Sequence, residues 1–212
     1  MKHLDKNSTA LLITDPQNDF LAESGVAYGL VKDNLAELDT VKNIESLLKT
    51  ASENNWPIFI SPHYYFEHDK KWQHRGALQK TIHEIDMYRV ENKQGKVDLT
   101  GTGADFLESL KEYIYHEGTT ITSPHKVYGP ESNDLVLQLR MQGIQTVLIG
   151  GLAANLCTDS HMRELVEQGF EVYMIKDAVG APGKAAYEAA MTNYELIANG
   201  VVSTAEVLRL LT

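Results

Sequence analysis

Residues 147–181 read VLIGGLAANLCTDSHMRELVEQGFEVYMIKDAVGA and include Cys157, the single cysteine of the chain. The stretch opens on a short apolar run, 147–149, which passes into two glycines. Beyond the cysteine, residues 158–168 have helical spacing, and a second apolar run follows at 170–175. A short apolar strand, a helix and another short apolar strand in succession are typical of a parallel sheet.

The same alternation extends through the rest of the chain. The predicted strands are continuous apolar runs without a polar face, which indicates a sheet covered on both sides. We therefore predict an α/β fold, a three-layer α/β/α, doubly wound, Rossmann-like domain with a mainly parallel six-stranded sheet. We expect strands at 9–14, 57–61, 119–123, 146–149, 170–175 and 201–203, and helices at 33–54, 104–116, 132–142, 158–168 and 184–199. A final helix is expected from Thr204 onward, with Thr204 as its cap.

The composition of the chain argues against nucleic acid and membranes as partners. The chain has 212 residues, with 29 acidic and 19 basic side chains and a net charge of −10. A nucleic-acid binder usually carries a basic face, so we predict no nucleic-acid partner. One cysteine cannot form an internal disulfide, which fits a reducing compartment. No stretch approaches the roughly 20 apolar residues of a membrane span. We expect one soluble, cytoplasmic domain, 1–212, with no membrane partner.

Three polar side chains fall at or just beyond predicted strand ends: Asp15, Lys126 and Cys157. An open doubly wound sheet binds its ligand beyond the carboxyl ends of its strands, where the strand order reverses. The predicted architecture therefore brings these three residues to one edge of the sheet, although they are far apart in the sequence.

These three groups suit nucleophilic catalysis. A thiolate is the reactive form of cysteine, and the start of a helix favours it. Asp15 could accept the thiol proton, Lys126 could balance the negative charge, and backbone N–H groups before Cys157 could bind an oxyanion. Each residue also has an ordinary alternative. A lone cysteine is more often an inert core residue, an aspartate at a strand end often caps a turn, and a loop lysine is usually solvated.

Three blocks of sequence carry a family resemblance. They are LLITDPQNDF at 11–20, ITSPHKVYGP at 121–130 and the stretch 147–181 quoted above. Together they resemble the isochorismatase-like cysteine hydrolases, which include nicotinamidases, N-carbamoyl amide hydrolases and isochorismatases. The similarity extends over most of the chain, from about 9 to 204.

The resemblance implies an isochorismatase-like hydrolase fold and a catalytic triad of Asp15, Lys126 and Cys157. It also implies a cis peptide bond between Leu152 and Ala153. The N–H groups of Ala153 and Cys157 would then form the oxyanion hole. Some isochorismatases lack the cysteine, so its presence here points to hydrolysis of an amide, ureide or carbamoyl C–N bond through a thioester.

Two alternatives stay open from the residues. One is a vinyl-ether hydrolase of the isochorismatase type, and the other is a non-catalytic protein that binds a small molecule or senses thiol chemistry. A hydrolase of either kind, cleaving a C–N bond or a vinyl ether, would have a small-molecule substrate as its partner. The family also implies a homodimer or homotetramer, and the physiological substrate is not specified by any motif.

The segment 63–101 exceeds ordinary loop length, so we expect an insertion that shapes the pocket or subunit contacts. Candidate substrate-binding residues come from this insertion and from the motifs themselves. They are Phe20, His63, Trp72, Tyr128, Asn155 and Leu156. We assign His161, four residues after the cysteine, a structural or interface role.

Some nicotinamidases bind a divalent metal through a D-x-H motif after the second strand. Here the matching residues are Ser61, Pro62 and His63, so the aspartate is missing. The nearby His63, His68, His74 and His83 could supply ligands, but their spacing matches no zinc pattern. We predict that no metal is required, and that a divalent metal near His63 is the alternative.

Overall fold

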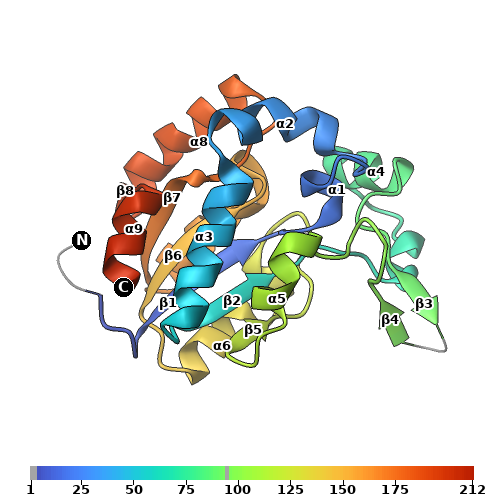
Figure 1. The fold of residues 1–212 in the computed structure, drawn as a ribbon. Coiled ribbons are helices and arrows are strands. Elements are labelled where there is room, and N and C mark those ends of the chain that lie inside the picture. Colours follow the sequence, from blue (N-terminus) through green and yellow to red (C-terminus); the bar gives the residue numbers. More distant parts are fainter. Residues whose placement is uncertain (1–3, 94–95) are drawn as a thin grey trace.

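The computed structural model describes residues 4–93 and 96–212 and contains a six-stranded sheet in the order β5-β2-β1-β6-β7-β8. Every strand pairs in parallel with its neighbours, and helices cover both faces (Figure 1). The predicted three-layer, doubly wound fold is therefore confirmed. The strands are β1 Thr9–Thr14, β2 Ile58–Ser61, β5 Thr119–Ile121, β6 Thr146–Gly151, β7 Glu171–Val179 and β8 Gly200–Val202.

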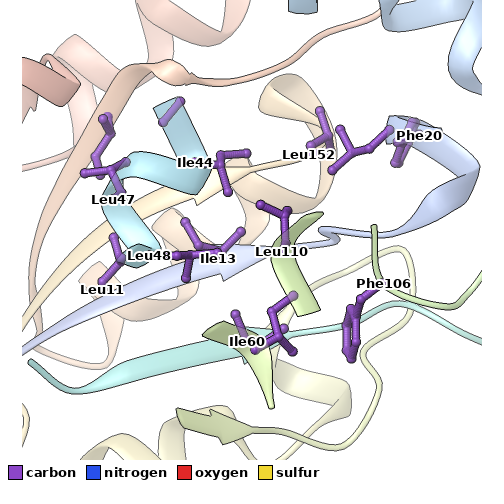
Figure 2. Close-up of a cluster of buried hydrophobic side chains, with 14 of the residues drawn as sticks. Leu11, Ile13, Phe20, Ile44, Leu47, Leu48, Ile60, Phe106, Leu110 and Leu152 are labelled. Atoms are coloured by element: carbon purple, nitrogen blue, oxygen red, sulfur yellow. The ribbon is translucent and has the colours of Figure 1, made fainter. Parts of the chain in front are cut away.

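Alternate residues of β1 face opposite layers, which explains its uninterrupted apolar sequence. Leu11 and Ile13 pack in one core with helices α2 (Tyr28–Glu37), α3 (Thr40–Glu53), α5 (Lys111–Ile114) and α9 (Thr204–Leu211). Ala10 and Leu12 pack in the other core with α6 (Leu135–Met141), α7 (Asp159–Glu167) and α8 (Lys184–Ile197). Figure 2 shows side chains of β1 against those of α3.

Two local predictions need correction. The single helix expected at 33–54 is two helices, α2 and α3, because Asp39 between them has a left-handed backbone with φ of 52°. The last helix is capped by Ser203 and not by Thr204. The Ser203 hydroxyl accepts from the Glu206 N–H, and the Glu206 carboxylate accepts from the Ser203 N–H, which is a capping box.

Residues 63–93 and 96–101 form short elements at the carboxyl end of the sheet. They comprise a 3₁₀ turn η1 (Glu67–Lys71), helix α4 (Ala77–Glu84) and the strands β3 (Glu91–Lys93) and β4 (Lys96–Asp98), which pair antiparallel apart from the main sheet (Figure 1). A short helix, α1 (Asn18–Leu21), follows β1 beside them. Further 3₁₀ turns are η2 (Glu108–Leu110) and η3 (Pro130–Ser132).

The strand order reverses between β1 and β6. From β1 the chain moves to β2 and β5 on one side, and from β6 it moves to β7 and β8 on the other. The crevice beyond the ends of β1 and β6 is therefore the expected ligand position of a doubly wound sheet. Among the helices of the described residues, none is long and apolar enough to cross a membrane.

Candidate active site

Asp15 lies directly after β1, at the reversal of strand order, and is fully buried. Its backbone has a left-handed conformation with φ of 49°, which turns the chain sharply out of the strand. The carboxylate contacts two side chains from distant segments. His125 Nε2 lies 2.6 Å from Oδ1, and the Tyr88 hydroxyl donates to Oδ2 at 3.4 Å.

The side chain beside Asp15 is that of His125, where the expected triad had Lys126. The His125 N–H donates to the Pro62 carbonyl at 2.9 Å, which fixes the segment after β5 in register with the segment after β2. Successive side chains of an extended segment point to opposite sides, so His125 contacts Asp15 and Lys126 takes a different direction.

The side chain of Lys126 is hydrogen-bonded to residues of the insertion. Its ammonium donates to the Tyr64 carbonyl at 2.7 Å and to Asp69 Oδ2 at 2.8 Å. The structure therefore brings Asp15 and Cys157 together with His125, and holds Lys126 on Asp69 of the insertion. Sequence reasoning missed His125 because the two residues are adjacent, and only the pairing register decides which one faces the site.

Hydrogen bonding defines the protonation of the His125–Asp15 pair. His125 Nδ1 contacts the Lys126 carbonyl oxygen, which can only accept, so Nδ1 carries a hydrogen. Nε2 and the Asp15 carboxylate must then share one further proton between them. The pair is an imidazolium and a carboxylate, or a neutral imidazole and a carboxylic acid, and its net charge is zero in both cases.

Cys157 lies in a single π-helical turn, η4 (Ala154–Thr158), between β6 and α7. Burial raises the pKa of its thiol well above the usual value, and the charge of Asp15 and a side-chain hydrogen bond with Asp15 add to this. Hydrogen bonds from the N–H groups of Ala153 and Cys157 lower the pKa of the thiol, but less strongly. The N–H groups beside the start of the helix therefore favour the thiolate as expected, but burial and Asp15 outweigh them.

The loop before Cys157 contains a cis peptide bond between Leu152 and Ala153, where the resemblance implied one. Thr14 holds this loop from β1: its hydroxyl lies 3.1 Å from the Leu152 carbonyl and 2.9 Å from the Thr158 hydroxyl. Gly151 precedes the bond with φ of 117°, and a Cβ there would lie 2.1 Å from the Thr14 carbonyl oxygen. The loop thus requires glycine for both backbone conformation and space.

His63, after β2, also faces the sulfur. Its Nδ1 lies 3.9 Å from Cys157 Sγ, and its ring stacks on Tyr88 with centroids 4.1 Å apart. Gln17 fixes its backbone, accepting from its N–H at 2.8 Å and donating to its carbonyl at 2.9 Å. Nε2 is buried and has no hydrogen-bond partner within the described part of the chain. Burial, and then the charges of His125 and Lys126, lower the pKa of His63 well below its usual value.

His161 lies close by but both of its ring nitrogens are occupied. Nδ1 lies 2.6 Å from the Cys157 carbonyl oxygen, and Nε2 lies 2.8 Å from the Ser61 hydroxyl. Its ring packs on Gly129, where a Cβ would lie 2.4 Å from Nδ1. These contacts support the structural role assigned to His161 from the sequence.

A cavity of about 100 Å³ opens beside Cys157. Its wall is almost wholly apolar and is built by α2, α4, the segment before β3 and the cysteine loop. The lining residues are Phe20, Ala27, Leu30, His63, Leu78, Thr81, Ile82, Ile85, Met87, Tyr88, Val127, Ala153, Leu156, Cys157 and Pro182.

Three of the six candidate substrate-binding residues line this cavity: Phe20, His63 and Leu156. The other three lie elsewhere. Trp72 packs edge-on against Tyr65, and Tyr128 is 45% exposed and donates to Glu164. Asn155 is half-buried in η4, beside the nucleophile but outside the wall. The apolar residues of α4 were not predicted, because no helix was expected within 63–101.

Four side chains converge within ligand distance of one another. Single donor atoms of Asp15, His63, His125 and Cys157 all lie within 4.8 Å of each other. Of the other histidines considered as ligands, His68 contacts Asp69, and His83 contacts Arg75. The donor cluster is therefore centred on the cysteine and not on the insertion.

Comparisons with known proteins identify the family of this chain. A family model described as the isochorismatase domain matches residues 9–206. An uncharacterized isochorismatase family protein, YwoC from Bacillus subtilis, is 30% identical over 88 residues, which are 42% of this chain and 47% of that protein. The matched region thus spans about half of that relative's length.

Solved structures share the fold. A cysteine hydrolase from Pseudomonas syringae pv. phaseolicola superimposes with a TM-score of 0.80 at 20% identity, covering 100% of this chain and 95% of the other. N-carbamoylsarcosine amidase from Thermoplasma acidophilum gives 0.65 at 15% identity, covering 93% and 96%. The chain belongs to the isochorismatase family, whose members are hydrolases.

Proposed function

We propose that this protein is a cysteine-dependent hydrolase that cleaves a C–N bond of an amide, ureide or carbamoyl compound through a thioester. The observation that carries the proposal is the environment of Cys157. Its sulfur lies at the wall of a cavity, hydrogen-bonded to Asp15 and approached by the N–H groups of Ala153 and Cys157. A nucleophile, a base and oxyanion donors are the minimum set for acyl transfer.

The proposed reaction begins with transfer of the thiol proton to Asp15. A carboxylate is available for this step when the shared proton of the His125–Asp15 pair resides on Nε2. The sulfur then attacks the carbonyl carbon, and the N–H groups of Ala153 and Cys157 bind the oxygen that becomes negative. Asp15 returns the proton to the departing nitrogen, which leaves as ammonia or an amine, and the acyl group remains on sulfur as a thioester.

Water completes the cycle. Asp15 removes a proton from a water molecule, which attacks the thioester carbon, and the sulfur leaves as a thiolate that takes the proton back. The products are a carboxylic or carbamic acid and free enzyme. His125, in the position expected for lysine, balances in its protonated form the negative charge that Asp15 and the sulfur share. These steps use residues of this chain alone, and we further propose a cytoplasmic homo-oligomer as their setting.

The lining of the cavity favours this reaction over hydrolysis of an anionic vinyl ether. Among the described residues that line the cavity there is no lysine or arginine. Lys126, the nearest candidate, is tied to Asp69. A carboxylate-bearing substrate would enter an apolar site without a cationic partner, which is unfavourable. We therefore expect the bound part of the substrate to be uncharged.

The test is a screen of small uncharged amides, ureides and carbamoyl compounds for ammonia release, with intact-mass detection of the acyl-enzyme. We expect an adduct on wild-type protein that is absent from Cys157→Ala, together with loss of turnover. His68→Gln, whose side chain is 71% exposed, is the matched control and should retain turnover. Turnover by Cys157→Ala at the wild-type rate would refute the proposed mechanism.

A further inference from the structure

The four side chains around the sulfur form a donor set that suits a metal ion. Asp15, His63, His125 and Cys157 are each buried, and they come from the ends of three strands and from η4. Thiolate, imidazole and carboxylate are the ligands of tetrahedral zinc sites. The topology of the sheet brings them together at the reversal of strand order, so no rearrangement of the fold is needed.

We propose that this cluster binds one divalent cation of the zinc class, and that the bound ion blocks Cys157 and reversibly inhibits the enzyme. The inhibition rests on the proposed function, whereas the binding does not. The site keeps only His63 of the four histidines considered from the sequence, and takes its other ligands from Asp15, His125 and Cys157.

The distances are close to those of a tetrahedral site. Zinc bonds of about 2.3 Å to sulfur and 2.0–2.2 Å to nitrogen or oxygen place neighbouring ligand atoms roughly 3.4–3.6 Å apart. Cys157 Sγ and His63 Nδ1 are 3.9 Å apart, and Asp15 Oδ1 and His125 Nε2 are 2.6 Å apart. These two separations lie on either side of the ideal, and all four ligand atoms lie within 4.8 Å of one another, so binding requires side-chain adjustments on the order of 1 Å.

The supporting hydrogen bonds also have the form found at metal sites. A histidine ligand generally donates its second N–H to a carbonyl or carboxylate, and His125 Nδ1 contacts the Lys126 carbonyl. The Tyr88 hydroxyl donates to the second carboxylate oxygen of Asp15. Gln17 holds the backbone of His63 through two hydrogen bonds. Three of the four ligands are therefore oriented before an ion arrives.

His63 and His161 show which imidazole is free to bind. Both nitrogens of His161 have partners, Ser61 and the Cys157 carbonyl. His63 has only the long contact to sulfur, and its Nε2 has no partner in the portion of the chain that the structure describes. A buried imidazole without a strong hydrogen bond is unusual, because burial of an unsatisfied polar group is costly. An ion bound at Nδ1 would give this imidazole the strong partner that it lacks, with the ring hydrogen on Nε2.

The charges and protons of the site balance when the divalent ion is bound. A dication with one thiolate, one carboxylate and two neutral imidazoles has no net charge, which suits a buried site. Two protons leave to the solvent: the thiol proton of Cys157, and the proton that Asp15 and His125 share. No electron transfer is involved, so removal of the ion with a chelator restores the starting state.

Cobalt(II) is the probe for binding. Chelator-treated, reduced protein is titrated with Co²⁺ under anaerobic conditions, and the absorption spectrum is recorded. We expect one ion per chain, a near-ultraviolet thiolate-to-cobalt band and intense visible bands of tetrahedral cobalt, all lost when Zn²⁺ is added. Zn²⁺ should also protect Cys157 from iodoacetamide, and a chelator should end the protection. The absence of both the thiolate band and the protection would overturn the proposal.

Variants locate the ion. Cys157→Ser should lose the near-ultraviolet band, and His63→Gln and His125→Gln should each weaken binding at least about tenfold, since loss of even an outer partner costs about 10–100-fold. His83→Gln is the matched control, because His83 belongs to the insertion and contacts Arg75. Thermal unfolding verifies that each variant is folded. Unchanged Co²⁺ affinity in folded His63→Gln and His125→Gln would place the ion elsewhere and overturn the proposal.

Inhibition by the bound ion is tested separately, by measuring turnover. With any substrate found by the amide screen, one equivalent of Zn²⁺ should abolish turnover, and excess chelator should restore it. If no substrate is turned over, the spectra and the alkylation protection still decide whether the ion binds. If turnover is present and Zn²⁺ leaves it unchanged, the regulatory part of the proposal is refuted while the hydrolase function stands.

Discussion

At the scale of single residues, the choice between His125 and Lys126 decides the chemistry of the site. The imidazole of His125 shares a proton with Asp15, while the ammonium of Lys126 is bound to Asp69 and to the Tyr64 carbonyl. Burial lowers the pKa of Lys126, and its contacts with Asp69 oppose that effect. The two neighbours therefore have separable roles, one in the site and one in holding the insertion to the sheet.

Lys126→Met tests this separation through stability. The Asp69 side chain is 4% exposed and would keep a charge without its partner. Breaking a fully buried pair costs about 3–5 kcal/mol, and we expect about 2–3 kcal/mol here because the Lys126 side chain is 16% exposed. Urea unfolding measures the loss. Adding Asp69→Asn to the same chain should recover much of it, and a double variant no more stable than Lys126→Met would contradict the assignment.

His125→Asn tests the other half of the assignment through activity. It removes the group that shares a proton with Asp15, and acid–base groups of this kind contribute about 10²–10⁴-fold to rate. We expect kcat to fall by roughly that factor while the protein remains folded. The measurement is kcat on a substrate from the amide screen, with circular dichroism as the control for folding. A kcat within about twofold of wild type would show that His125 has no part in the reaction.

At the scale of secondary-structure elements, the loop from β6 to α7 positions the nucleophile. It combines a positive φ at Gly151, the cis peptide bond before Ala153 and the π-helical turn that holds Cys157. Thr14 anchors it to β1, so the base at the end of β1 and the nucleophile after β6 are held on neighbouring strands.

Gly151→Ala should disrupt this loop. The added Cβ would lie 2.1 Å from the Thr14 carbonyl oxygen, and φ of 117° is unfavourable for any residue with a Cβ. We expect a loss of stability of several kcal/mol, in the upper range for single substitutions (about 4 kcal/mol or more), and loss of turnover. Gly143→Ala is the control, since that glycine also has a positive φ but its Cβ would meet no atom within 4 Å. Equal effects of the two changes would show that crowding at Gly151 is not the cause.

The start of α6 provides a pH-dependent prediction. Burial acts to raise the pKa of Asp134, but hydrogen bonds from Ser123 and Gln138 outweigh it, and the pKa is lowered from 3.8. A carboxyl group with a lowered pKa in the folded state stabilises the protein above its unfolded pKa, and this contribution is lost as pH falls through the folded pKa. Wild type should therefore be more stable than Asp134→Asn at pH 7, and the difference should shrink below pH 4. Urea unfolding at both pH values gives the comparison, and a constant difference would contradict it.

At the scale of the whole molecule, the insertion closes one side of the cavity over the sheet. Leu78 and Ile82 of α4 face the cysteine loop across it, and the segment before β3 adds Tyr88. The fold supplies the nucleophile and base from strand ends, whereas the insertion supplies seven of the fifteen residues that line the cavity. Substrate selectivity should therefore depend on α4 more than on the sheet.

Leu78→Ala tests this division. Leu78 lines the cavity but is only half-buried, so we expect little loss of stability and a wider pocket. The ratio of kcat/KM for a substrate with a larger apolar group to that for a smaller one should rise about tenfold, in the range known for single methylene differences. Leu137→Ala on α6, where the side chain is 59% exposed, is the control. An unchanged ratio in Leu78→Ala would show that this residue of α4 does not determine substrate selectivity.

Local sequence determined most of the architecture. The apolar runs at 9–14 and 146–149 predicted strands buried on both faces, and both strands are buried over their whole length. Asp15 and Cys157 were identified because strand ends converge at the reversal of strand order, which is a property of the fold class. The side-chain period of two and the apolar content of each segment carry this information locally.

The tertiary structure alone decided whether His125 or Lys126 contacts Asp15, and in which direction the pKa of the Cys157 thiol shifts. His125 and Lys126 exchange roles with a shift of one residue in register, and that register depends on the contact with Pro62 from a distant strand. The raised pKa of the Cys157 thiol likewise follows from burial by segments far away in the sequence. Patterns along a chain specify which residues can line an edge, but distances and desolvation arise only when the segments pack together.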